Sequence, residues 1–174
     1  MNELLNNGDG AFKELIQCLE HEVKLYNQLG DLLKAKQSNI IKGDVESLQN
    51  NVHEEQRLIP KIRTATRARE LRAATIAAVS KMSCKTPSLM ELIDLTPSHY
   101  SQQLIEYREH LILRLDQIAH ANRENEFLLN SSLELVRGLV QVLLGKAENE
   151  NIHYGGHGQV YDDQTHNARV DCQV

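Results

Sequence analysis

The chain is poor in the residues that build sheets and tight turns. Aromatic residues make up 4% of the 174 positions, tryptophan is absent, and only three prolines occur. Leucine, glutamine, glutamate, asparagine and alanine are abundant instead. Such a composition favours long helices over a β-sandwich or a β-barrel. We therefore predict an all-α fold.

Cysteine is also scarce, and its pattern excludes a disulfide scaffold. The three cysteines, Cys18, Cys84 and Cys172, are odd in number and far apart, and none belongs to a CxxC pair. This usage is typical of a reducing compartment. The first ten residues are polar and acidic, without the basic and apolar regions of a signal peptide. We expect a soluble cytoplasmic protein.

Long apolar runs and a strong positive charge are missing as well. The richest apolar cluster, residues 133–144, is interrupted by Glu134, Arg137 and Gln141, whereas a membrane span needs about 20 apolar residues. The formal net charge is −5, which argues against a general nucleic-acid binder. The basic residues of segment 57–72 have no interleaved aromatics and read as a solvated helix face. We predict neither membrane insertion nor nucleic-acid binding.

The most regular pattern is a heptad seam in the last third of the helical region. It consists of Leu104, Arg108, Leu111, Leu115, Ile118, Asn122, Asn125, Leu129, Ser132, Val136, Leu139 and Leu143. Steps of three and four predict a long helix with a partner along one stripe. Asn122 and Asn125 occupy seam sites that are usually apolar, where polar residues set register or partner choice at a cost in stability.

Similar stripes and breaks divide the rest of the chain. We predict helices over residues 10–42, 45–82, 87–94 and 97–146. Asp9 and Asp44 are expected to cap the first two, and Gly43 to end the first in the left-handed conformation. Each Thr-Pro step, Thr86-Pro87 and Thr96-Pro97, is expected to open one of the last two. The second helix is expected to bend at Pro60 and continue, because its stripe stays in phase.

These elements predict the organisation of the whole chain. Residues 1–146 form one domain, an elongated antiparallel bundle or coiled coil of three long helices, because the break between the first two is short. Residues 147–174 are rich in Asn, Gly, His, Gln and Asp and form a flexible tail, since they have little apolar surface to bury.

No catalytic or metal-binding constellation emerges. There is no glycine-rich phosphate loop and no GxSxG motif. His153 and His157 are four apart, but the intervening glycines argue against a helix that would bring them together. His110 would be the acceptor if the bundle were a phosphotransfer domain, yet the bulky residues after it make a flank position the better interpretation. We predict no enzyme activity, no cofactor and no metal.

The remaining candidate for a functional site is a binding surface, and segment 122–144 offers the most apolar surface. It offers a wide apolar area at the end of a long helix, suited to association with another helix through anchors spaced by threes and fours. The alternative is that the same leucines pack against the first two helices.

Three motifs in this region resemble the FlgN family of bacterial flagellar export chaperones. They are Asn122-Arg123-Glu124-Asn125-Glu126-Phe127-Leu128-Leu129, then Ser132-Leu133-Glu134, then Tyr154-Gly155-Gly156-His157-Gly158-Gln159. The family pattern has two asparagines three apart, a Leu-Leu pair, an apolar helix end and a Tyr-Gly-x-x-Gly tail. The likeness extends over nearly the whole chain and is specific in residues 122–159.

The resemblance implies a function and its sites. Family members hold the C-terminal helices of hook-associated proteins, prevent their premature assembly and deliver them to the type III export gate, without ATP hydrolysis. The implied substrate-binding residues are Asn122, Asn125, Leu128, Leu129, Ser132, Leu133, Val136, Leu139, Val140 and Leu143. The two asparagines either bind substrate or fix the helix against its neighbours. Tyr154, Gly155 and Gly158 would dock on the cytoplasmic ring of the gate.

A second hypothesis uses the same seam without a substrate. The chain would then be a coiled-coil adaptor or structural protein that associates with itself. A monomer–dimer equilibrium is compatible with either hypothesis.

Overall fold

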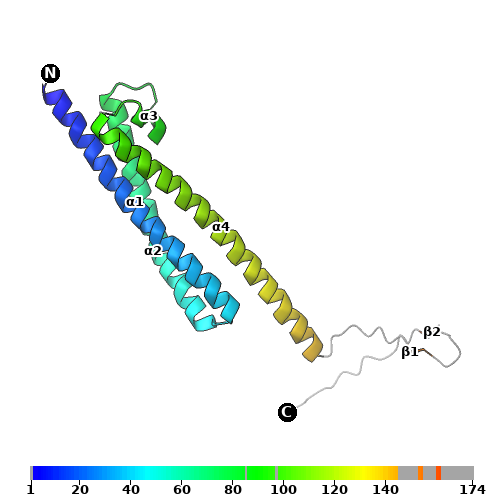
Figure 1. The fold of residues 1–174 in the computed structure, drawn as a ribbon. Coiled ribbons are helices and arrows are strands. Elements are labelled where there is room, and N and C mark those ends of the chain that lie inside the picture. The colour runs from blue at the N-terminus through cyan, green and yellow to red at the C-terminus, as the bar shows by residue number, and fades with distance from the viewer. Residues whose placement is uncertain (1, 85, 97, 145–152, 155–159, 162–174) are drawn as a thin grey trace, which may run out of the picture. The chain divides into compact units, whose positions relative to one another are not determined.

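A computed structural model describes residues 2–84, 86–96, 98–144, 153–154 and 160–161. It contains helices α1 (Asn2–Lys42), α2 (Val45–Val79), α3 (Leu89–Ile93) and α4 (Ser98–Leu143), and strands β1 (His153–Tyr154) and β2 (Val160–Tyr161) (Figure 1). The chain divides into two compact units, residues 1–131 and 132–174. The helices of the first unit pack against one another, which confirms the predicted all-α bundle.

The first unit is built on a helical hairpin of α1 and α2. Gly43 takes a φ of 68°, the left-handed conformation that ends α1. The backbone N–H of Asp44 then donates to the carbonyl of Asn39 at 3.0 Å. The Asp44 carboxylate accepts from the backbone N–H of Ser47 at 3.0 Å and caps α2. Both features were predicted from the Gly43-Asp44 break, and they turn the chain back on itself.

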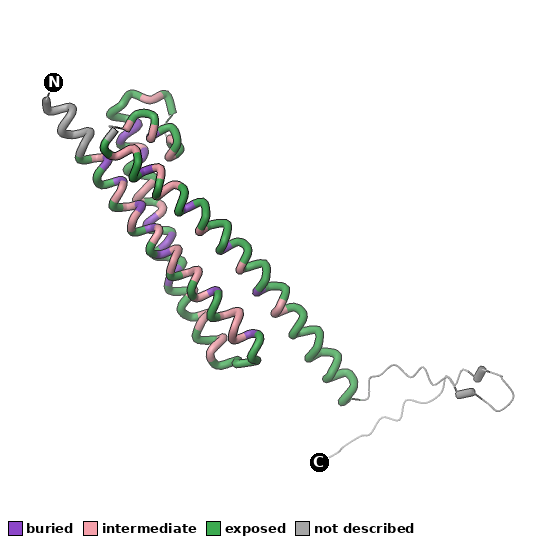
Figure 2. Tube along the Cα trace, viewed as in Figure 1, coloured by how far each residue is buried: buried purple, intermediate pink, exposed green. Residues whose placement is uncertain are grey.

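Apolar side chains spaced by threes and fours hold the hairpin together. Near one end, Phe12, Leu15 and Leu19 of α1 share a buried cluster with Ala73 and Ile76 of α2. Further along, Leu25 packs with Leu58, Ile62 and Ala65. Figure 2 shows these buried positions as purple segments that recur along the helices. The pairing of the beginning of α1 with the end of α2 makes the two helices antiparallel.

A buried carboxylate interrupts this apolar interface. Glu22 is 1% exposed, and its two oxygens accept from Thr66 Oγ1 and from Arg69 Nε, each at 2.6 Å. A buried charge needs such partners, because leaving it unpaired costs several kcal/mol. The α1–α2 register that brings Glu22 to both donors is therefore favoured over a shifted one.

Helix α4 packs against the hairpin, and every seventh residue of its first part is buried. Leu104, Leu111, Ile118 and Asn125 are buried. Leu104 belongs to the cluster of Phe12, and Asn125, three heptads further on, bonds to Leu33, three heptads beyond Phe12. Helix α4 therefore runs parallel to α1. The other half of the predicted seam is not buried to the same degree, since Leu115 and Asn122 are exposed.

Several element boundaries differ from those predicted. Helix α1 begins at Asn2, so Asp9 lies inside it, because nothing in residues 2–9 forbids helical backbone. Helix α2 continues through Pro60, as predicted, but ends at Val79, because Lys81 adopts a left-handed φ of 53°. Helix α3 is shorter than residues 87–94. Its cap is Ser88, in a capping box with Glu91, and not the predicted Thr86.

The tail contains one regular feature that was not predicted. Strands β1 and β2 pair antiparallel, with His153 opposite Tyr161 and Tyr154 opposite Val160. Two residues per strand are too few to show the alternation by which a strand is recognised in a sequence. The rest of the predicted tail, together with Gly145 and Lys146 before it, lies outside the described residues.

A candidate protein-binding face on α4

The predicted face begins in the first unit, where its residues have different environments. Asn122 is exposed, Leu128 and Leu129 are half-buried, and Asn125 is 2% exposed. The side-chain amide of Asn125 donates to the backbone carbonyl of Leu33 at 3.0 Å. The contact holds α4 against α1. It corresponds to the second of the two roles expected for the asparagines, which was to fix the helix against its neighbours.

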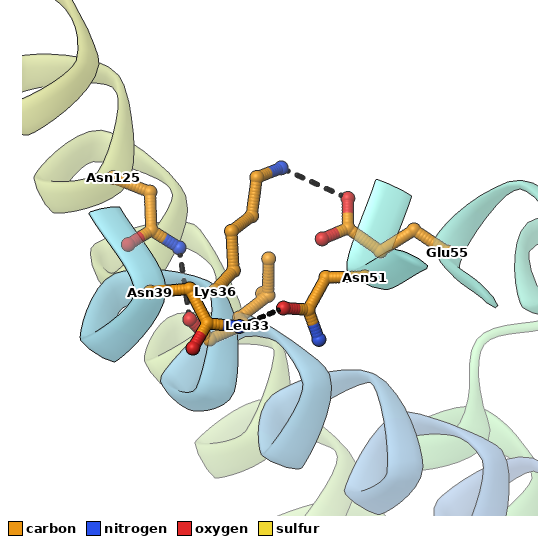
Figure 3. A network of polar contacts seen from close by, with 6 residues as sticks. All are labelled: Leu33, Lys36, Asn39, Asn51, Glu55 and Asn125. Carbon is orange, nitrogen blue, oxygen red and sulfur yellow. Dashed lines mark hydrogen bonds and ion pairs between the residues drawn. The ribbon is translucent and has the colours of Figure 1, made fainter. Parts of the chain in front are cut away.

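Polar contacts surround this point on the hairpin side (Figure 3). Lys36 of α1 forms an ion pair with Glu55 of α2 at 3.0 Å, and both side chains are about 15% exposed. One turn along, the Asn39 side chain donates to that of Asn51. The apolar seam of the unit thus gives way to polar contacts towards the turn at Gly43. The Asn125 bond belongs to this polar stretch.

The second unit contains the larger part of the face, at the end of α4. Ser132, Leu133, Val136, Leu139, Val140 and Leu143 were predicted to belong to it, and all are exposed. The exposed fractions are 51% for Leu133, 55% for Leu139 and 84% for Leu143. A run of large exposed apolar side chains is a candidate contact surface for another molecule.

The exposed apolar surface is wider than the predicted face. Leu135, Val142 and Leu144 are 66%, 71% and 70% exposed. Eight of the twelve residues 133–144 are therefore large, apolar and exposed. At about 100° per residue, these eight occupy an arc of roughly 200° around the helix. The predicted face includes the other five of these residues and leaves out Leu135, Val142 and Leu144.

Charge on this segment is confined to a narrow strip. Glu134, Arg137, Gly138 and Gln141 occupy the remaining side of the helix. Gly138 is not required by packing, because a Cβ there would meet nothing within 4 Å. The apolar side of this segment therefore contains no charged residue.

Histidine, cysteine and carboxylate side chains are spread over several helices in the described part of the chain. No group of three His, Cys, Asp or Glu side chains there is arranged to hold a metal ion. His110 is exposed and lines a small pocket of about 210 Å³ with Val23 and Asn27. His157, His166 and Cys172 lie outside the described residues. None of the described helices is long and apolar enough to cross a membrane.

The predicted docking residues of the tail are only partly described. Tyr154 belongs to β1 and pairs with Val160. Gly155 and Gly158 lie outside the described residues.

The described residues form an all-α helical bundle, and the densest run of exposed apolar side chains lies at the end of α4, in residues 133–144. The chain belongs to the FlgN family, because the family model described as FlgN protein matches residues 1–161. This is a chaperone family, and its general role is that of a flagellar export chaperone. Comparisons with curated proteins and with solved structures found no match.

Proposed function

We propose that the chain binds the C-terminal helices of hook-associated proteins in the cytoplasm. It prevents their premature assembly and delivers them to the type III export gate. The observation that carries the proposal is the exposed apolar end of α4, residues 133–144. Helices that polymerise must have their apolar stripes covered before export, and an open helix face covers such a stripe by coiled-coil packing.

The size of the face fits this role. The exposed fractions of its eight apolar side chains amount to about five fully exposed aliphatic residues. At roughly 60–120 Å² each, they offer about 300–600 Å² of apolar surface. A specific complex buries about 800 Å² per partner, of which somewhat more than half is apolar. The α4 end can therefore supply most of the apolar part of one such interface.

A charge placed on the face tests the proposal. We expect Leu139→Asp to weaken binding of a hook-associated C-terminal peptide by about 10- to 100-fold, because a carboxylate must be desolvated where a leucine was buried. Isothermal titration calorimetry measures the change. Gln141→Asp adds the same charge on the polar strip and should bind like the wild type.

Circular dichroism separates loss of binding from loss of folding. Leu139→Asp should keep the helicity of the wild type, since Leu139 is already 55% exposed. Leu111→Asp should unfold the bundle, since Leu111 is 6% exposed. If Leu139→Asp unfolds as well, or binds the peptide normally, the face is wrongly assigned.

Docking at the export gate is proposed for Tyr154, with Gly155 and Gly158 shaping the chain beside it. We expect Tyr154→Ala to leave substrate binding unchanged and to weaken capture by the cytoplasmic ring of the gate, measured by surface plasmon resonance. Tyr161→Ala changes a tyrosine of the paired strand and serves as the control. Equal losses in both variants, or loss of substrate binding with Tyr154→Ala, would contradict separate sites.

Self-association is the second candidate, because one exposed apolar face is complementary to another copy of itself. Sedimentation at several concentrations decides between the two. A stable dimer that the substrate peptide neither dissociates nor binds would favour an adaptor over a chaperone.

A further inference from the structure

The apolar arc at the end of α4 has two flanks, one on each side of Leu143, and both are open. One flank consists of Leu135, Leu139 and Val142, with exposed fractions of 66%, 55% and 71%. The other consists of Leu133, Val136 and Val140, with exposed fractions of 51%, 55% and 45%. Neither flank is covered in the way that the seam residues Leu104 and Leu111 are, with 0% and 6% exposed. We call them the first and second flanks.

Each flank has the spacing of a complete helix-binding stripe. The first advances by four and then three residues, and the second by three and then four. In a heptad these are the a and d positions for one flank, and the b and e positions for the other. At about 100° per residue, the centres of the two flanks lie roughly 130° apart around the helix.

One partner helix is too narrow to cover both flanks. Two helices meet along a stripe about 100° wide, whereas the apolar arc here is roughly 200°. A helix seated on the first flank would leave Leu133 and Val140 in water, and one on the second would leave Leu135 and Val142. The exposed area left over would be about half of the face.

We infer that the end of α4 receives two amphipathic helices at once, one on each flank, both from a single export substrate. This inference rests on the proposed function. Each helix would present apolar residues at intervals of three and four. Two helices that belong to one polypeptide lose less entropy on binding than two separate molecules, because the second association is intramolecular.

Other occupants fit the face less well. A helix that lies on a membrane surface has a polar side rich in lysine and arginine. Here the polar strip contains one base, Arg137, beside Glu134, Gly138 and Gln141. A second copy of the chain would cover one flank and leave the other exposed. Copies of the chain alone would therefore cover both flanks only in an assembly larger than a dimer.

Site-specific cross-linking tests the inference. A photoreactive benzoyl-phenylalanine replaces Leu139 in one protein and Val140 in another, and each is irradiated with a full-length hook-associated protein. Mass spectrometry of the digested adducts should identify one substrate helix joined to position 139 and a different one joined to position 140. Benzoyl-phenylalanine in place of Gln141 is the control and should form few adducts.

The other outcomes are distinguishable. If both positions join the same substrate helix, or if only one position forms adducts, the two-helix inference is wrong while the chaperone function stands. Adducts with residues 133–144 of another copy would contradict both the two-helix inference and the chaperone function, and would indicate self-assembly. If titration detects no complex with the wild type, the proposed function itself fails.

Affinities give a second, independent readout. Leu139→Asp and Val140→Asp should each weaken binding of the full-length substrate at least tenfold, and the double variant should abolish it. With a peptide of the C-terminal helix alone, Leu139→Asp should reduce affinity and Val140→Asp should not. Equal losses for this single helix in both variants would overturn the inference.

Discussion

Single residues fix the register and the ends of the helices in this bundle. Glu22 bonds to Thr66 and Arg69, and the pair holds α1 and α2 in one alignment. Asp44 caps α2 by accepting from Ser47. This hydrogen bond is the main reason that the pKa of the Asp44 carboxyl is lowered from its usual value of 3.8.

The lowered pKa of Asp44 predicts a pH dependence. Because the folded state holds the carboxylate more strongly than the unfolded one, its contribution to stability is present above the unfolded pKa, about 3.9. It is lost as the pH falls through the lower folded pKa. The unfolding midpoint of wild type should therefore exceed that of Asp44→Asn at pH 7.

This difference in midpoint should shrink as the pH falls from about 5 to below 3. Urea titrations followed by circular dichroism at several pH values measure it. Asp31→Asn, on the exposed surface of α1, is the control. A difference between wild type and Asp44→Asn that stays constant over this range would show that the charge of the cap has no part in stability.

Helix α4 changes character along its length. Its seam is apolar at Leu104, Leu111 and Ile118, and polar at Asn125. The Asn125 amide bonds to Leu33, but its Oδ1 is buried and has no partner among the described residues. The Leu33 carbonyl lies inside α1, where the helix already provides it with a donor. The Asn125 contact therefore aligns α4 with α1, and the unpaired Oδ1 makes this alignment costly in stability.

Replacing this asparagine should stabilise the protein. We expect Asn125→Leu to raise the free energy of unfolding by about 1 kcal/mol, because it removes a buried oxygen that has no hydrogen bond. Urea denaturation measures the effect. Asn122→Leu changes an exposed seam site and should leave the midpoint within error. A large loss of stability in Asn125→Leu would mean that the amide bond outweighs the orphaned oxygen.

At the scale of the whole molecule, the buried core and the proposed binding face lie in different parts of the chain. The buried core lies in residues 1–131, and the exposed apolar face lies in residues 132–144. A chain truncated after Ser131 should therefore unfold cooperatively, with a thermal midpoint within a few degrees of the full chain. It should lose substrate binding.

Differential scanning calorimetry and titration with the substrate peptide check the two parts of this prediction. The chain truncated after Leu144 is the control, since it keeps the face and removes the tail. It should bind like the full chain. A strong fall in the midpoint after truncation at Ser131 would show that the α4 end contributes to the core.

Much of this architecture could be read from local signals. The Gly43-Asp44 break, the cap at Asp44 and the passage of α2 through Pro60 depend on neighbouring residues in the sequence, and the structure confirms them. The boundaries that differed, at Asn2, Val79 and Ser88, are set by competition between near-equal local conformations. Propensity does not resolve such competition.

The binding face could be predicted only in part. The spacing of Leu133, Val136 and Val140 marks an apolar stripe, but spacing does not tell whether a stripe is buried. The motif also placed Asn122 and Asn125 together, whereas one is exposed and the other is buried against Leu33. Periodicity assigns residues to a face of their own helix, and burial depends on what lies opposite.

The sequence by itself determined that this protein is a helical bundle with a turn at Gly43 and an apolar end to its last long helix, because helix periodicity, capping and chain reversal are local properties. Only the tertiary structure decided which apolar residues form the core and which stay exposed. The heptad spacing that buries Leu104 and Leu111 leaves Leu139 open, because burial requires a partner that the spacing does not specify.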